Sequence, residues 1–146
     1  MEEALARARR ALPEGEVPIG CVGVRDGTEL ASAHNRTITL TDPTAHAEIL
    51  ALRQAAAAAG NHRLTGCDLY VTLEPCAMCL GACIQARVRR IVFGAPDPRW
   101  GCLGSRIDLG RPGLFNHTPA IVGGILAEPC RELLHTFFQA KRCASS

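Results

Sequence analysis

Residues 69–79 have the sequence LYVTLEPCAMC, and this stretch decides how the chain is organised. Its first five residues are apolar, aromatic or β-branched, which predicts a buried strand. Pro75 then marks a helix start, because proline is favoured in the first turn of a helix. Cys76 and Cys79 have the helical spacing that brings two thiols to one edge of a helix end. The stretch therefore predicts a strand followed directly by a helix that carries a cysteine pair at its N-terminus.

A second polar group precedes this stretch, at residues 46–48, which are His-Ala-Glu. Residues 42–44 offer a cap residue and a proline, and the alanine-rich segment 45–59 predicts a helix. Residues two apart on a helix point about 200° away from each other. His46 and Glu48 can therefore serve one site only if this helix aims its N-terminus at that site.

One imidazole and two thiolates, from His46, Cys76 and Cys79, form a typical ligand set for zinc. Three protein ligands leave the fourth tetrahedral position to water, which indicates a catalytic zinc rather than a structural one. Two helix N-termini aimed at one point would favour thiolates over thiols. Glu48 is not needed as a ligand and can accept a proton from the bound water and deliver it elsewhere. The pattern predicts a zinc site with Glu48 as its proton shuttle.

The remaining elements are expected from apolar runs and turn signals. The Asp-Gly pair at residues 26–27 lies between two apolar runs and predicts a β-hairpin. A loop of about 25 residues, rich in Gly, Pro and Arg, precedes the last strand and is long enough to indicate a function. We expect an α/β fold in one domain, 1–146, with one mixed sheet and helices on both faces. The expected helices are 1–12, 45–59, 75–86 and 128–142, and the expected strands are 17–24, 30–35, 67–73, 89–94 and 121–124.

The composition is that of a folded protein with reduced thiols. The chain has 146 residues and a net charge of +2, and its 47% hydrophobic content excludes a disordered protein. Its N-terminus lacks an apolar signal segment, and it has no run of about 18 apolar residues, so we expect a cytoplasmic protein without a membrane partner. In that compartment clustered cysteines indicate metal or catalysis. The six other cysteines are expected to be small buried or partly exposed thiols: Cys21, Cys67, Cys83, Cys102, Cys130 and Cys143.

Further segments accompany the metal pattern along nearly the whole chain. They are EVPIG at 16–20, HNR at 34–36, DPTAHAE at 42–48, VFGA at 92–95 and GILAE at 124–128. Together with residues 69–79 they resemble the TadA-type bacterial tRNA adenosine deaminases of the cytidine/deoxycytidylate deaminase superfamily. The resemblance implies a three-layer, cytidine-deaminase-like fold with five strands, a homodimer, and one zinc ion per subunit. It also implies hydrolysis of adenosine to inosine at the wobble position of a tRNA anticodon, with ACG the expected anticodon.

The same resemblance implies contacts to the substrate outside the metal site. Asn35 on the second strand would contact the flipped nucleoside, and Val17 with Ile19 would form part of an apolar wall. An alternative role for these two residues is ordinary strand core, and for Phe137 and Phe138 it is ordinary helix packing. The candidate substrate-binding residues are Asn35, Val17, Ile19, Ala47, Asp97, Arg99, Phe137, Phe138, Lys141 and Arg142.

Charge and aromatic side chains are unevenly divided along the chain. Residues 1–86 hold seven basic and ten acidic side chains, whereas residues 87–146 hold nine and four. Five of the six aromatic residues also lie in the second part, which is where we expect RNA phosphates and bases to bind. The prolines on both sides of Asp97 and the presence of Trp100 depart from the family pattern. These departures leave the breadth of substrate choice open.

Three alternatives share parts of this pattern. A deaminase of a small base, nucleoside or nucleotide, of guanine or cytidine type, would keep the zinc site and most of the fold. A non-catalytic, zinc-stabilised subunit would typically lack the shuttle glutamate, which is present here as Glu48. A thiol oxidoreductase could use Cys76 and Cys79, because thioredoxin-like sites also begin with a strand and Cys-x-x-Cys at a helix start.

Overall fold

One mixed sheet organises the structure, a computed structural model that describes residues 1–146. Its strand order is β2-β1-β3-β4-β5. β1 is antiparallel to both β2 and β3, whereas β3, β4 and β5 run parallel. The five-stranded mixed sheet expected from the sequence is confirmed. The strands are β1 (Gly20–Arg25), β2 (Thr28–His34), β3 (Cys67–Leu73), β4 (Arg90–Ala95) and β5 (Ala120–Val122).

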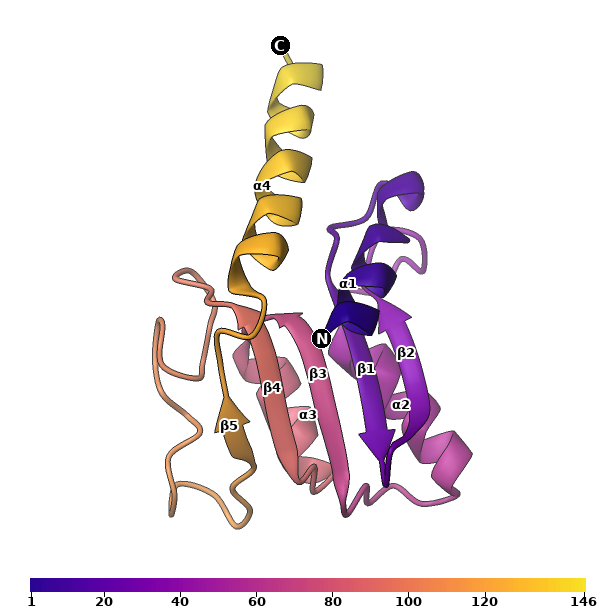
Figure 1. Ribbon diagram of the computed structural model, residues 1–146, viewed down its shortest axis with the longest axis vertical. Coiled ribbons are helices and arrows are strands. Elements are labelled where there is room, and N and C mark those ends of the chain that lie inside the picture. Colours follow the sequence, from indigo (N-terminus) through magenta and orange to yellow (C-terminus); the bar gives the residue numbers. More distant parts are fainter.

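Helices cover both faces of this sheet, as expected (Figure 1). In Figure 1, α2 and α3 lie behind the sheet and α1 and α4 lie in front of it. α4 packs on the sheet near its start, where Cys130 is its one buried residue, and then projects beyond the strands (Figure 1). None of the helices has the length and apolar composition needed to cross a membrane. The helices are α1 (Glu2–Arg9), α2 (Ala47–Ala59), α3 (Ala77–Gln85) and α4 (Ala127–Ala144), with a 3₁₀ turn at Leu12–Glu14.

The predicted hairpin joins β1 and β2, but its first strand is shorter than expected. Asp26 and Gly27 both have positive φ, 51° and 74°, as the central residues of a tight hairpin turn require. The strand expected to begin at Val17 begins at Gly20. Pro18 has no N–H to donate to a sheet, and the Ile19 N–H donates to the Val17 carbonyl over 2.8 Å, which turns the chain instead of extending it.

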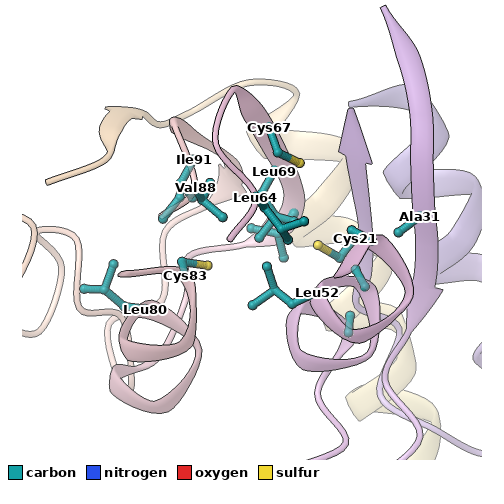
Figure 2. Packing of buried hydrophobic residues seen from close by; sticks show 14 of the residues in the cluster. Cys21, Ala31, Leu52, Leu64, Cys67, Leu69, Leu80, Cys83, Val88 and Ile91 are labelled. Carbon is teal, nitrogen blue, oxygen red and sulfur yellow. The ribbon is translucent and has the colours of Figure 1, made fainter. Parts of the chain in front are cut away.

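The main hydrophobic core lies between the sheet and the helices α2 and α3 (Figure 2). Leu64, Leu69, Leu80 and Ile91 are among its largest fully buried side chains. Several predicted structural thiols belong to it, and burial raises the pKa of the Cys83 thiol. Five of the six cysteines outside the pair are buried, as expected, whereas Cys143, near the end of α4, is exposed rather than partly exposed. The core also includes Phe93, so that aromatic residue is not available to RNA.

On the other face, α1 approaches β1 closely enough to require a glycine. Ala4 and Ala8 of α1 are fully buried, and their backbone faces Gly20. A Cβ atom at Gly20 would collide with the Ala4 carbonyl and lie 2.5 Å from the Ala8 nitrogen. Backbone atoms cannot move aside as a flexible side chain can, so a larger residue at position 20 would push α1 off the sheet.

Two glycine-to-alanine substitutions are therefore expected to act in opposite directions. Gly20→Ala should lower the free energy of unfolding by about 1–3 kcal/mol through overpacking. Gly81→Ala is the matched control, because Gly81 lies in the exposed face of α3 with open space around it. It should raise stability by about 0.5–1 kcal/mol, since alanine is the better helix former. Urea denaturation measures both, and equal effects would contradict the close approach of α1.

Candidate metal centre and substrate pocket

Two helix N-termini meet at this site, as the residue spacing predicted. His46 is the N-cap of α2 and Cys76 is the N-cap of α3, and both have extended backbones with ψ of 154° and 175°. These helices therefore begin one residue after His46 and Cys76, rather than at Ala45 and Pro75 as expected. Neither N-cap side chain bonds to its own helix end. Both side chains are free to act as ligands.

The three predicted ligands lie together with the spacing of a metal site. The Nδ1 atom of His46 is 3.7 Å from the Cys76 Sγ and 3.5 Å from the Cys79 Sγ. All three donor atoms lie within 4.8 Å of one another. In a tetrahedral zinc site with usual bond lengths, a nitrogen and a sulfur ligand are about 3.6 Å apart. The three side chains therefore fit a zinc ion with one position left open.

The thiol chemistry of the pair is also suited to a cation. Hydrogen bonds from the Cys79 thiol and from His46 lower the pKa of Cys76 to about 4, although its partial burial acts in the opposite direction. The same hydrogen bond to Cys76, together with burial, raises the pKa of Cys79. Without a metal the pair therefore holds one thiolate and one thiol, and a metal ion would have to displace the proton of Cys79.

Glu48 lies in the first turn of α2, and its side chain is only 4% exposed. Burial raises the pKa of this carboxyl, because a charged group loses its hydration there. Glu48 nevertheless lines the same cavity as His46 and Cys76. A buried carboxyl with a raised pKa at the wall of a cavity is suited to accept and return a proton near neutral pH.

A cavity of about 720 Å³ opens beside these side chains. Its walls come from the segment before β1, the N-termini of α2 and α3, the segment after β4, and α4. Most of the lining residues are hydrophobic, and they include His46 and Cys76 of the three grouped side chains. They are Val17, Ile19, Pro43, His46, Glu48, Leu73, Glu74, Cys76, Ala77, Met78, Pro96, Asp97, Arg99, Trp100, Leu134 and Phe138.

The structure divides the predicted substrate-binding residues into two groups. Five of them line the cavity, namely Val17, Ile19, Asp97, Arg99 and Phe138. Val17 and Ile19 precede β1 and line the cavity, and Ile19 also packs against the main core. The other five do not line it. Asn35 is buried directly after the end of β2, and Ala47 is fully buried. Phe137 directly precedes Phe138 on α4 and is half-buried, whereas Lys141 and Arg142 are exposed further along the helix.

Several lining residues were not predicted from the sequence. Leu134 and Phe138 are four residues apart on α4, a spacing that would have identified Leu134 as a neighbour of the chosen Phe138. Trp100 is 70% exposed at the cavity mouth, and its presence in a Gly- and Pro-rich loop was the one available signal. Glu74 was part of the quoted stretch, but nothing in its local sequence indicated a role.

Comparison with known proteins assigns the family. Residues 1–95 match the model of the cytidine and deoxycytidylate deaminase zinc-binding region. The chain belongs to the cytidine and deoxycytidylate deaminase family. A Bacillus subtilis tRNA-specific adenosine deaminase is 46% identical over 97% of this chain and 88% of its own. A Haemophilus influenzae tRNA-specific adenosine deaminase is 46% identical over 97% of this chain and 83% of its own.

Solved structures of this deaminase family share the fold. One, from studies of A-to-I editing by tRNA:A34 deaminases at the wobble position of transfer RNA, has 47% identity and a TM-score of 0.86. It covers 92% of this chain and 97% of that chain. A guanine deaminase from Nitrosomonas europaea has 27% identity and a TM-score of 0.81, covering 93% and 81%. The cytidine-deaminase-like fold expected from the sequence is confirmed.

The low pKa of Cys76 predicts a thiol that reacts as a thiolate across neutral pH once the metal is removed. An ordinary free thiol, with a pKa of about 8.5, alkylates about tenfold faster for each added pH unit below that value. Between about pH 6 and 8 the pH stays above the pKa of Cys76, so this thiol remains ionised. Its rate of alkylation by iodoacetamide should therefore be nearly constant over that range. Mass spectrometry of the labelled peptide, with glutathione as reference, measures this. A tenfold rise per unit at Cys76 would contradict the hydrogen-bonded thiolate.

Proposed function

We propose that this chain hydrolyses adenosine to inosine at the wobble position of a tRNA anticodon. The structural observation that carries the proposal is Glu48, a buried carboxyl in a cavity that also holds His46 and Cys76. Relatives named tRNA-specific adenosine deaminases match over 97% of the chain, including the segments that form this cavity. This support favours a tRNA substrate over a free base.

We propose that His46, Cys76 and Cys79 hold one zinc ion per chain, and that Glu48 moves the protons. Zinc bound there would lower the pKa of a water molecule to about 7 and so make hydroxide available at neutral pH. Glu48 accepts the proton of the attacking water and donates it to the ring nitrogen next to C6 as the new C–O bond forms. Glu48 then takes the proton of the new C6 hydroxyl and delivers it to the amino group, so that the C6–N bond breaks, the C6=O bond forms and ammonia departs.

The rest of the cavity is suited to hold a nucleoside taken out of a stacked RNA loop. Val17 and Ile19 offer an apolar wall for the base. Asn35 does not line the cavity, but its buried side-chain amide takes part in none of the side-chain hydrogen bonds within the chain, and the family resemblance supports a contact from it to the substrate. Arg99 and Trp100 lie on one side of the mouth, where guanidinium and indole groups suit phosphates and neighbouring bases.

α4 also lines the cavity, through Leu134 and Phe138, and we propose that the anticodon stem-loop lies along this helix. Phe137 points its ring to Lys141, whose Nζ is 5.3 Å from the ring centroid. Lys141 and Arg142 are exposed in the last turns of the helix, where they would meet phosphates.

The family resemblance further supports a cytoplasmic homodimer of single-domain chains that acts on tRNA with an ACG anticodon. Apolar side chains left exposed on the segment between β4 and β5, at Ile107, Leu114 and Phe115, are consistent with a subunit contact. A sedimentation-equilibrium mass of a single 15.6 kDa chain would contradict the dimer.

The second candidate is a guanine deaminase, favoured by the structural likeness to the Nitrosomonas europaea enzyme. The two proposals differ in substrate size. Assays on an anticodon stem-loop with an ACG anticodon, on free adenosine and on guanine distinguish them. Inosine at the wobble position supports the tRNA proposal, whereas turnover of guanine alone would replace it.

Replacing Glu48 tests its role in proton transfer. Glu48→Ala should keep zinc, measured by atomic emission, and lower kcat for inosine formation by at least about 100-fold, the contribution of a general acid–base group. Glu29→Ala is the control, because Glu29 is an exposed carboxylate on β2 outside the cavity, and it should leave both quantities unchanged. Full activity of zinc-loaded Glu48→Ala would remove Glu48 from this role.

The two neighbouring phenylalanines of α4 should differ in their effect on RNA binding. Phe138→Ala should raise KM for the stem-loop by about tenfold, because stacking of one base on an aromatic ring contributes about 1–3 kcal/mol. Phe137→Ala should have a smaller effect, since that ring lies outside the cavity and contacts Lys141. Steady-state kinetics on the same RNA compares them, and a larger effect at Phe137 would place the RNA elsewhere.

A further inference from the structure

Glu74 is a buried carboxylate that the proposed chemistry does not use. It follows β3 directly and precedes Pro75 and the ligand Cys76. Only 2% of its surface is exposed, yet none of the ion pairs in the chain involves it. A buried carboxylate without a cation needs hydrogen-bond donors to compensate for its lost hydration.

All of its side-chain hydrogen-bond donors come from one short segment, residues 97–105, which we call the pocket loop. The Asp97 N–H donates to Glu74 Oε1 over 3.2 Å, and the Ser105 hydroxyl donates to the same oxygen. Glu74 Oε2 accepts from the Leu103 N–H at 2.9 Å and from the Ser105 N–H at 3.2 Å. One carboxylate thus accepts hydrogen bonds from both ends of the loop. Hydrogen bonds to a charged acceptor are stronger than those between neutral groups.

The rest of the loop is shaped around this carboxylate. The Gly101 N–H donates to the Asp97 carbonyl over 2.8 Å, and a Cβ at Gly101 would collide with the Glu74 carboxylate. The Cys102 N–H donates to the Pro75 carbonyl over 3.0 Å. The loop therefore closes over Glu74 and is attached to the segment that carries the zinc ligand Cys76.

The same loop supplies one side of the cavity mouth. The Asp97 carboxylate accepts from the N–H groups of Arg99 and Trp100, at 3.0 and 3.2 Å, which folds these two residues into a tight turn. Arg99 and Trp100 line the cavity, although their side chains are exposed. Their position depends on a turn whose Asp97 N–H is itself held by Glu74.

We propose that Glu74 is a positioning residue that holds the pocket loop in the conformation which presents Arg99 and Trp100 to the substrate. Glu74 lines the cavity, but the pocket loop donates hydrogen bonds to both of its carboxylate oxygens, so it acts through that loop. It sets the affinity for the nucleotides around the reacting base, and it leaves proton transfer by Glu48 unchanged. The RNA part of this inference rests on the proposed function, whereas the ordering of the loop does not.

Glu74→Gln is the most direct test, because it keeps the shape and replaces one acceptor oxygen by a donor group. The new NH₂ group can take the place of Oε1, where it faces the Asp97 N–H. It can instead take the place of Oε2, where it faces the N–H groups of Leu103 and Ser105. Either orientation breaks at least one hydrogen bond of the loop. Ser105→Ala is a milder variant that removes only the hydroxyl donor.

Trp100 reports on the loop without any assay of activity, because it is the only tryptophan in the chain. Its fluorescence anisotropy in the zinc-loaded, RNA-free protein should fall in Glu74→Gln and, by a smaller amount, in Ser105→Ala. KM for the stem-loop should rise about tenfold in Glu74→Gln, the factor that corresponds to a lost interaction of about 1.4 kcal/mol. The value of kcat should stay within about twofold, and zinc content should not change.

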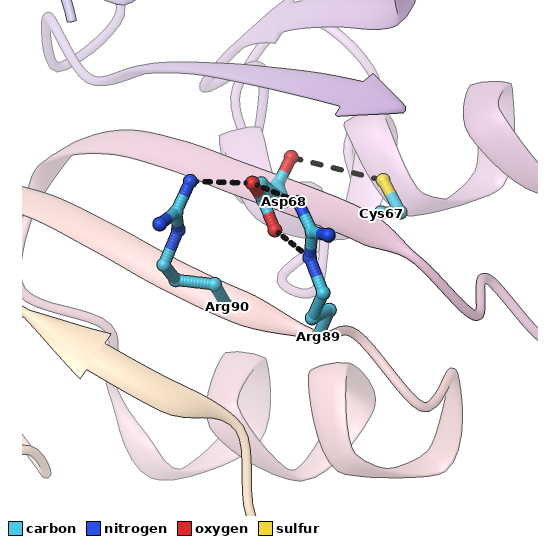
Figure 3. Close-up of polar contacts among 4 residues, drawn as sticks. All are labelled: Cys67, Asp68, Arg89 and Arg90. Atoms are coloured by element: carbon cyan, nitrogen blue, oxygen red, sulfur yellow. Dashed lines mark hydrogen bonds and ion pairs between the residues drawn. The ribbon is translucent and has the colours of Figure 1, made fainter. Parts of the chain in front are cut away.

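Asp68→Asn is the matched control for the loss of a buried carboxylate. Asp68 lies near the start of β3, the strand that Glu74 follows, is 4% exposed, and is held by Arg89 and Arg90 at 2.7–2.9 Å (Figure 3). It pairs with the start of β4, at the end of the sheet away from the pocket loop. Asp68→Asn should lower the melting temperature but leave the Trp100 anisotropy and KM unchanged.

The outcomes separate the inference from the proposed function. Unchanged anisotropy and KM in Glu74→Gln would overturn the positioning role. A loss of zinc or a lower kcat at constant KM would also overturn it, because Glu74 would then act on the metal end through Pro75. If the unaltered protein does not deaminate the stem-loop, the proposed function fails, and the anisotropy of the variants still decides whether Glu74 orders the loop.

Discussion

The rest of the structure depends on the meeting of two helix N-termini at the end of β3. His46 and Cys76 cap α2 and α3 with extended backbones, so their side chains turn away from their helices and toward each other. The third donor, on Cys79, lies in the first turn of α3. The positive ends of the two helix dipoles would repel a cation at this junction. The negative charge of the thiolates offsets this repulsion and makes binding of a cation favourable. The packing of α2 and α3 on the sheet therefore forms the core and also brings the three donor side chains together.

β3 carries a buried carboxylate at each end, and the two are compensated in different ways. Asp68, near its start, is paired with two arginines, and these hydrogen bonds and charges hold the pKa of its carboxyl below the usual value. Glu74, just after its end, is compensated by backbone and hydroxyl donors of the pocket loop. A cation beside Glu74 would bring charge next to the metal site, whereas neutral donors order a loop without doing so. Asp68, far from the grouped His and Cys side chains, is paired with cations, whereas Glu74, beside them, is paired with neutral donors.

Local signals were sufficient to predict most elements and the grouping of His46, Cys76 and Cys79. The Asp26-Gly27 turn predicted its hairpin because positive φ at both positions requires such residues. The spacing of Cys76 and Cys79 predicted a shared edge because helix geometry fixes it. The strand expected at Val17 was wrong at its start, since the effect of Pro18 depends on which neighbour the chain would have paired with. The role of Glu74 could not be predicted, because its partners lie 23 to 31 residues away in a loop without periodicity.

By itself the sequence determined the mixed sheet and the family, and it predicted the ligand set and the shuttle residue, because each rests on residue type at short and fixed spacing. Only the tertiary structure decided which residues form the cavity walls. It placed Val17 and Ile19 at the wall instead of in a strand. It also showed that Phe138 and Trp100 line the cavity, whereas Phe137 does not. The physical reason is that a wall is made by segments far apart in the chain, and their meeting depends on tertiary packing rather than on any local preference.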